Sequence, residues 1–208
     1  MNRLDNFINE CDIALKTLSF KKSGTGRSYP ANKTSSSLSK EEKSLSAQLM
    51  RVNLAGEVAA QALYRGQAMV CKDAEIKNHL VQAGEEETDH LIWCKKRLEE
   101  LNGKPSILNP IWYAGSFAIG AIFGSFGEKT SLGFVEETEK QVVKHLEKHL
   151  DKVSKNDAET IEILKTMRAD EDEHAQEAID NGSESLSEPT KKVMSFTAKV
   201  MTSSSAYI

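Results

Sequence analysis

The sequence has few cysteines, and their arrangement excludes two classes of small protein. Only three occur among 208 residues, Cys11, Cys71 and Cys94, and no two of them form a Cys-x-x-Cys pair. An odd number of cysteines at wide spacing fits neither a disulfide framework nor a structural zinc site. A reducing compartment is therefore the expected setting.

The chain also lacks a basic cluster and a targeting segment. Its formal net charge is −4, and its lysines and arginines are scattered among glutamates, which argues against nucleic acid as a partner. The N-terminus carries Asp5, Glu10 and Asp12. It has neither the basic and apolar regions of a secretory signal nor the composition of a transit peptide.

Sustained strand alternation is absent too, and helical periodicity recurs instead. The pattern predicts an all-α protein with four long helices, over about 39–70, 73–102, 132–150 and 156–181. Ser39 and Asp73 are expected to cap the first two, and the fourth to start near Asn156. We assign residues 1–20 to a peripheral N-terminal helix and 21–40 to a flexible linker. Residues 41–208 form the main domain, which ends in a short helix opening at Pro189.

Residues 105–127 form a long stretch without any charged residue. Its length makes it a candidate for a membrane span, but Pro110 and several glycines interrupt it. A single span there would also place half of the metal ligands proposed below on each side of the bilayer. We therefore expect a buried crossover, or an apolar surface that lies in the membrane interface.

Two histidines follow a glutamate by three residues, in the segments Glu87-x-x-His90 and Glu171-x-x-His174. Positions i and i+3 share one face of a helix, so each pair can present a carboxylate and an imidazole to one metal. Together these ligands suit iron or manganese. As a short motif, Glu-x-x-His is weak evidence when it stands alone.

The helical phase strengthens the metal hypothesis. Around the first motif the shared face reads Leu80, Ala83, Glu87, His90, Cys94, Leu98 and Leu101, and around the second it reads Leu164, Met167, Glu171, His174 and Ala178. Both stripes are apolar except at the motif, so they are expected to face the core. An ionised carboxylate there is costly unless it is paired or binds a metal.

The other two long helices supply one carboxylate each. On the first helix, Glu57 lies on the same face as Gln61 and Tyr64; on the third, phase selects Glu139, whereas Glu136 and Glu137 fall on a solvated face. One Glu from each of two helices and Glu-x-x-His from the other two is the ligand set of ferritin-like dinuclear bundles.

Several alternatives stand beside this hypothesis. A metal-free structural bundle would explain the same residues as solvated charges and a hydrogen-bonded core histidine. A ferritin-like iron oxidase or storage protein would use the same six ligands. Tyr64 fits an ordinary core role, with a radical or hydrogen-bonding role as the alternative, and His145 and His149 are interpreted as surface or outer residues.

Four longer segments resemble the demethoxyubiquinone hydroxylase family, and the resemblance extends over nearly the whole chain, including the N-terminal helix and linker of bacterial members. They are LMRVNLAGEV at 49–58, EEETDHL at 85–91, NPIWYAGSF at 109–117 and MRADEDEH at 167–174. One departure is Leu54, where many members are expected to have His.

The resemblance implies a di-iron monooxygenase of ubiquinone biosynthesis. Glu57, Glu87 and His90 would hold one iron and Glu139, Glu171 and His174 the other, with Glu87 and Glu171 bridging both. The substrate would be a polyprenyl-methoxy-methyl-benzoquinol, hydroxylated on its ring with O2 and a reductant. The resemblance further implies peripheral contact with the cytoplasmic face of a bacterial cell membrane, biosynthetic partner proteins and a homo-oligomer.

Overall fold

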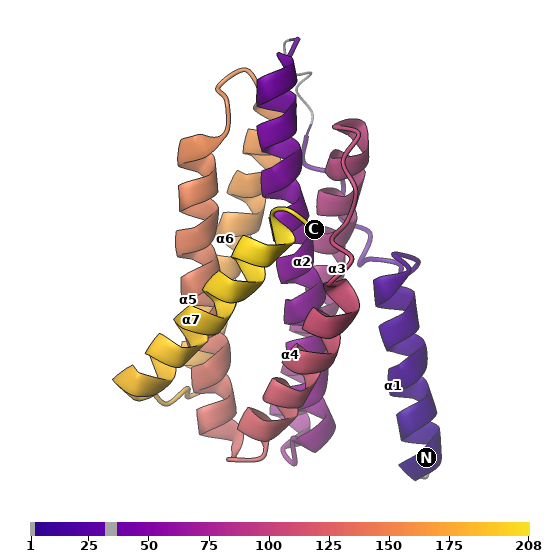
Figure 1. Ribbon diagram of the computed structural model, residues 1–208. Helices are drawn as coiled ribbons and strands as arrows, with labels where there is room; N and C mark the ends of the chain where they lie inside the picture. Colours follow the sequence, from indigo (N-terminus) through magenta and orange to yellow (C-terminus); the bar gives the residue numbers. More distant parts are fainter. Residues whose placement is uncertain (1–2, 32–36) are drawn as a thin grey trace.

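The computed structural model describes residues 3–31 and 37–208, and within them every regular element is a helix (Figure 1). The helices are α1 (Arg3–Leu18), α2 (Lys40–Val70), α3 (Ala74–Glu100), α4 (Asn109–Gly124), α5 (Glu128–Lys152), α6 (Ala158–Asp180) and α7 (Glu188–Ser205). The hairpins α2–α3 and α5–α6 pack together as a four-helix bundle, and α4 lies along α2. The predicted all-α bundle is confirmed.

The ends of the helices agree with some of the predicted boundaries and differ from others. Ser39 caps α2 in a capping box with Glu42, and Asp73 caps α3, as predicted. Asp157 rather than Asn156 caps α6, because its side chain accepts a hydrogen bond from the backbone N–H of Thr160. Helix α5 begins at Glu128, ahead of the predicted 132, and the C-terminal helix is 18 residues long instead of short.

The uncharged stretch forms α4, whose two faces have different surroundings. Tyr113 and Gly120 are buried, whereas Ile111 and Ile122 are exposed. A Cβ on Gly120 would lie 2.2 Å from the carbonyl oxygen of Leu63 on α2, so the two backbones can approach this closely only with glycine there. In the described ranges, no helix combines the length and the apolar character that crossing a bilayer requires.

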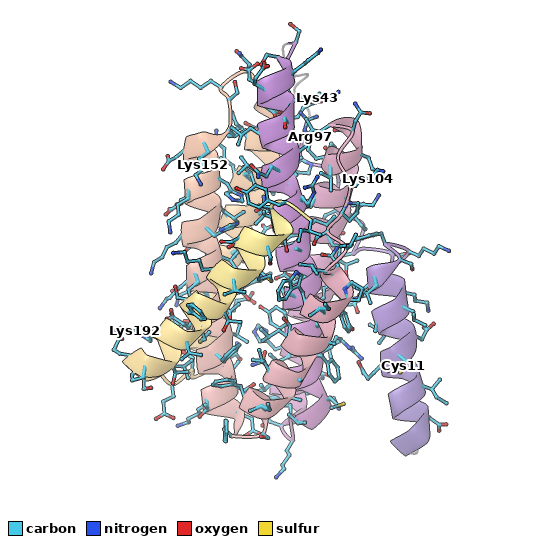
Figure 2. The ribbon with its side chains drawn as sticks, viewed as in Figure 1. Cys11, Lys43, Arg97, Lys104, Lys152 and Lys192 are labelled. Atoms are coloured by element: carbon cyan, nitrogen blue, oxygen red, sulfur yellow. The ribbon has the colours of Figure 1, made fainter. Side chains whose placement is uncertain are left out.

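A buried arginine ties α3 to the start of α6. Arg97 is 4% exposed and donates hydrogen bonds to Asp157 at 2.7 Å, Glu159 at 2.6 Å and Thr160 at 2.9 Å. Figure 2 labels this side chain within the bundle, whereas the labelled Lys152 and Lys192 belong to outer surfaces. The contact fixes the second motif helix against the first.

The N-terminal part contacts the bundle in several places. The hydroxyl of Thr17 on α1 donates to Gln61 on α2 at 2.9 Å, and Arg65 pairs with Glu10. Beyond α1, the backbone N–H of Thr25 donates to Asp89 on α3 at 3.0 Å. The division at residues 20 and 40 stays a prediction, and positions 32–36 of the predicted flexible linker lie outside the described residues.

Candidate metal centre

The six predicted ligands all lie in the interior of the bundle. Each side chain is at most 4% exposed. Four helices supply them: Glu57 is on α2, Glu87 and His90 are on α3, Glu139 is on α5, and Glu171 and His174 are on α6. The apolar stripes on which they were predicted are buried with them, including Leu80, Leu98, Leu164 and Met167. Helical phase therefore located these side chains correctly.

Two glutamates each span the gap between the two histidines. Glu87 places one oxygen 3.1 Å from Nδ1 of His90 and its other oxygen 3.2 Å from Nδ1 of His174. Glu171 does the same, at 3.2 Å and 3.4 Å. Each carboxylate thus has one oxygen beside each imidazole. A ligand that bridges two adjacent cations would have this arrangement.

The remaining two glutamates, Glu57 and Glu139, have different surroundings. Ligand atoms of Glu57, Glu87, His90 and Glu171 lie within 4.8 Å of one another, so four of the six converge on one position. Glu139 is positioned differently, because its Oε1 accepts a hydrogen bond of 2.8 Å from the Tyr64 hydroxyl. Tyr64 thus has the hydrogen-bonding role that was the alternative to simple packing.

The outer nitrogens of both histidines contact carboxylates that the periodicity argument did not single out. Nε2 of His90 lies 2.8 Å from Asp170 on α6, and Nε2 of His174 lies 3.0 Å from Glu86 on α3. Each outer carboxylate therefore comes from the opposite motif helix. The signal was present in the sequence, since an acidic residue directly precedes both Glu87 and Glu171. Such outer partners fix the tautomer that leaves the inner nitrogen free to bind a metal.

The enclosed charges shift one another's protonation. Burial, followed by the neighbouring Glu87 and Glu171, raises the pKa of Glu57 well above its ordinary value. Burial and the charges of Glu171 and Glu87 likewise raise the pKa of Glu139. Burial acts against ionisation of Glu87 as well, but the two histidines beside it, His174 and His90, outweigh burial and lower its pKa. The cluster therefore holds protons unless cations replace them.

The donor set and its geometry fit a pair of divalent cations. Glu87 Oε1, Glu171 Oε2 and His174 Nδ1 are buried and have no hydrogen-bond partner in the described part of the chain, although they lie close together. Atoms so arranged face a shared centre instead of satisfying one another. Four carboxylates and two neutral imidazoles also carry the charge that two divalent ions neutralise.

Other candidates from the sequence lie elsewhere. His145 and His149 are paired with each other on α5, with ring centroids 4.0 Å apart, and His149 is buried instead of lying on the surface. Glu136 and Glu137 were predicted to be solvated, but both are half-buried: Glu136 pairs with Lys140, and Glu137 pairs with Lys191 at 3.7 Å. The start of α7 packs against this face of α5 through Lys191. The helical phase of α5 alone could not predict this contact.

Comparison with known proteins agrees with the arrangement. Residues 44–205 match the family described as "Ubiquinone biosynthesis protein COQ7". The chain belongs to this family. It is 50% identical to a 3-demethoxyubiquinol 3-hydroxylase of Legionella pneumophila (strain Lens) over 99% of this chain and 97% of the relative. Proteins of the same name from Francisella philomiragia and Nitrosococcus oceani are 49% and 46% identical, covering 96% and 100% of this chain and 94% and 98% of the relatives.

The match to the COQ7 family covers the part of the chain that contains the candidate metal centre. The matched residues contain all six predicted ligands together with Glu86 and Asp170. The matched residues do not include α1 or the segment up to Lys43. The N-terminal residues that contact α3 and α6 therefore lie outside the region matched by the family. Leu54, the departure noted in the sequence, is fully buried in the core.

Proposed function

We propose that this protein is a di-iron monooxygenase that hydroxylates the ring of 3-demethoxyubiquinol in ubiquinone biosynthesis. The observation that carries the proposal is the pair of carboxylates, Glu87 and Glu171, each with one oxygen at both histidines. The name shared by relatives of 46–50% identity supplies the substrate. The reaction joins one oxygen atom of O2 to the ring, and two electrons and two protons convert the other to water.

In this proposal the six buried side chains divide the binding of the metals. Glu57 and His90 would hold one iron, Glu139 and His174 would hold the other, and both would share Glu87 and Glu171, which contact both histidines. Iron bound there supplies the redox chemistry with O2 that protein side chains lack. In this proposal Asp170 and Glu86 accept hydrogen bonds from the Nε2–H groups of the histidines and so orient each Nδ1 inward.

Residues around the ligands exclude water and hold a proton at a defined place. Cys94 and Met167, both fully buried, close the core beside the carboxylates, with their sulfurs 3.7 Å apart. The Tyr64 hydroxyl keeps its proton, because burial and the nearby Glu139 raise its pKa well above the ordinary value. Tyr64 can therefore donate to Glu139 but is not ionised at neutral pH.

We also propose that an apolar surface on α4 meets the membrane in which a polyprenyl substrate resides. Four large side chains of this segment are prominently exposed: Ile107 (75%), Ile111 (61%), Ile122 (54%) and Phe126 (66%). Helix α7 lies on the same side of the bundle in Figure 1 and exposes Phe196 (69%). Exposed apolar patches of this kind mark interaction surfaces, which supports the proposal that the protein lies peripherally at the cytoplasmic face of the membrane.

The activity is tested with the demethoxyquinol, a reductant and 18O-labelled O2, with the product followed by mass spectrometry. One labelled oxygen atom is expected in the hydroxylated ring. Glu87→Ala and Glu171→Ala should abolish both iron loading and product, because each removes a ligand that both metals share. Glu173→Ala, an exposed position on the same helix as Glu171, is the matched control. Normal iron stoichiometry in either ligand variant would contradict the proposal.

The membrane surface is tested separately by flotation with phospholipid vesicles. Ile111→Glu combined with Ile122→Glu should weaken vesicle binding and slow turnover of a long-tailed substrate, while iron content stays normal. Ile179→Glu on α6, at a position 39% exposed, is the control. Vesicle binding that is unchanged in the double variant rules out α4 as the contact surface.

A further inference from the structure

The supports behind the two histidines are unequal. Asp170, which contacts His90, is held by Arg27, whose Nη2 lies 3.0 Å from Oδ1 and 2.8 Å from Oδ2. On the outer side of Glu86, which contacts His174, the hydrogen bond within the described residues comes from the neutral amide of Gln82 at 3.2 Å, and Arg27 acts on Glu86 only by its charge at longer range. The Glu86 side chain is 32% exposed, compared with 17% for Asp170. The pseudo-symmetric ligand set therefore has asymmetric surroundings.

Arg27 belongs to a non-helical segment that is fixed against α3. Lys22 pairs with Glu85 at 3.1 Å, and Thr25 donates from its backbone N–H at 3.0 Å, and from its hydroxyl, to the buried Asp89. A Cβ on Gly24 would lie 2.0 Å from Asp89 Oδ1, so only glycine allows this approach. These contacts lie beside His90 in sequence and bring the segment over it.

Arg27 also contacts a second group that orients the same histidine. Its guanidinium carbon lies 5.0 Å from the centroid of the Trp93 ring, within the range of a cation–π contact. The Trp93 ring is in turn 5.3 Å from the His90 ring. Arg27, which lies outside the matched family region, thus contacts both neighbours of His90: the carboxylate at Nε2 and the tilted Trp93 ring beside it.

We propose that Arg27 is a positioning residue for His90 and makes the two metal positions unequal, so that the position on His90 binds its cation more tightly than the position on His174. The inference rests on the proposed metal centre. Its physical basis is orientation: a carboxylate fixed by a guanidinium keeps Nε2 bonded and Nδ1 directed at the metal. The Glu86 side chain is less constrained than that of Asp170, so the imidazole of His174 is held less firmly in its orientation.

The test is a titration of the metal-free protein with Co2+ under anaerobic conditions, followed by visible absorption and by calorimetry. The wild-type protein should bind two equivalents in two resolved steps. Arg27→Gln should weaken the tighter step by about tenfold, the lower end of the effect of losing an outer-shell partner, and leave the weaker step unchanged. Arg168→Gln is the matched control, since Arg168 lies near Asp170 on α6 but pairs with Glu147.

Two further variants assign the steps to their positions. In a His174→Gln background the remaining binding is expected to belong to His90 and to weaken when Arg27→Gln is added. In a His90→Gln background, Arg27→Gln should have no effect. Arg27→Lys keeps the charge without the planar fork and serves if Arg27→Gln fails to fold; it should weaken the tighter step partially.

The outcomes separate this inference from the proposed function. If wild-type protein binds two equivalents and Arg27→Gln binds them with unchanged affinities, or loses affinity equally in both steps, the role of Arg27 is overturned while the metal centre stands. If wild-type protein binds no Co2+ and no Fe2+, the metal centre itself fails, and the inference fails with it.

Discussion

Replacement of Glu57 by Gln is expected to stabilise the metal-free protein while damaging its metal site. Glu57 is 4% exposed, and one of its carboxyl oxygens lies within 4.8 Å of one from Glu87, so two buried carboxyls are neighbours. Burial and the charges of Glu87 and Glu171 raise its pKa well above 4.5. The folded protein therefore takes up a proton here that the unfolded chain releases at neutral pH. A glutamine imitates the protonated form, because it has a similar shape and is neutral at every pH.

The size of the effect follows from proton linkage. Each pH unit between the ordinary value of 4.5 and pH 7 costs about 1.4 kcal/mol if the folded carboxyl stays protonated, an upper limit of about 3.4 kcal/mol. For a chain of this size the limit corresponds to a rise in Tm of about 7–14 °C. Because the folded-state pKa is the higher one, the penalty on the wild type grows as pH rises and disappears below pH 4.5. At pH 5 the variant should gain less than about 1 kcal/mol.

The assay is urea and thermal unfolding of chelator-treated proteins at pH 5 and pH 7, repeated after Co2+ is added. Glu57→Gln should be more stable than the wild type without metal at pH 7 and should gain less from the metal, since ligand binding stabilises by RT ln(1 + [L]/Kd). Glu173→Gln, which changes an exposed carboxylate, should alter neither quantity. A metal-free Glu57→Gln variant that is less stable than the wild type at pH 7, or whose gain is equal at both pH values, would refute the reasoning.

Three further predictions concern stability away from the ligands. Burial lowers the pKa of His149 to about 3, so the unfolded chain takes up this proton at a higher pH than the folded protein. Between pH 7 and pH 5 the free energy of unfolding, measured in urea, should therefore fall by about 2 kcal/mol more in the wild type than in His149→Gln. Arg97→Met removes the guanidinium that faces the buried Asp157 and should lower stability by about 3–5 kcal/mol, seen as a fall in Tm that Asp157→Asn partly reverses. Gly120→Ala should cost about 1–3 kcal/mol by forcing α2 and α4 apart, whereas Gly115→Ala, with no atom within 4 Å of its Cβ, should not destabilise.

The ligand faces were predictable because a helix converts sequence spacing into direction. A stripe that is apolar except at Glu87 and His90 places those two side chains in the core whatever the rest of the fold does. Helix caps at Ser39 and Asp73 are equally local, and they too were predicted correctly. The choice of Glu139 over its neighbours needed nothing but the phase of one helix.

Features that depend on distant pairings could not be read in this way. Arg27 meets a partner 143 positions away in the sequence, in a segment with no periodicity to orient it. Half-buried Glu136 is another case, since it accepts a hydrogen bond from Ser183, which lies beyond the end of α6. The outer carboxylates Asp170 and Glu86 were predictable only in part. The sequence shows that each directly precedes a motif glutamate, but it does not show that each contacts the histidine of the other motif helix.

Charge neutrality explains how one interior can fold without metal and still suit two cations. The site contains four carboxyls and two imidazoles, which carry four negative charges when every proton is removed. Four protons neutralise that charge, and so do two divalent ions, whereas one divalent ion alone leaves a buried surplus that burial penalises strongly. Protons and metals are therefore alternative occupants of the same charge balance, and each metal must displace protons to enter. The resulting opposition between metal-free stability and metal affinity follows from burial itself, because the apolar stripes that position the ligands also remove the solvent that would otherwise stabilise their charges.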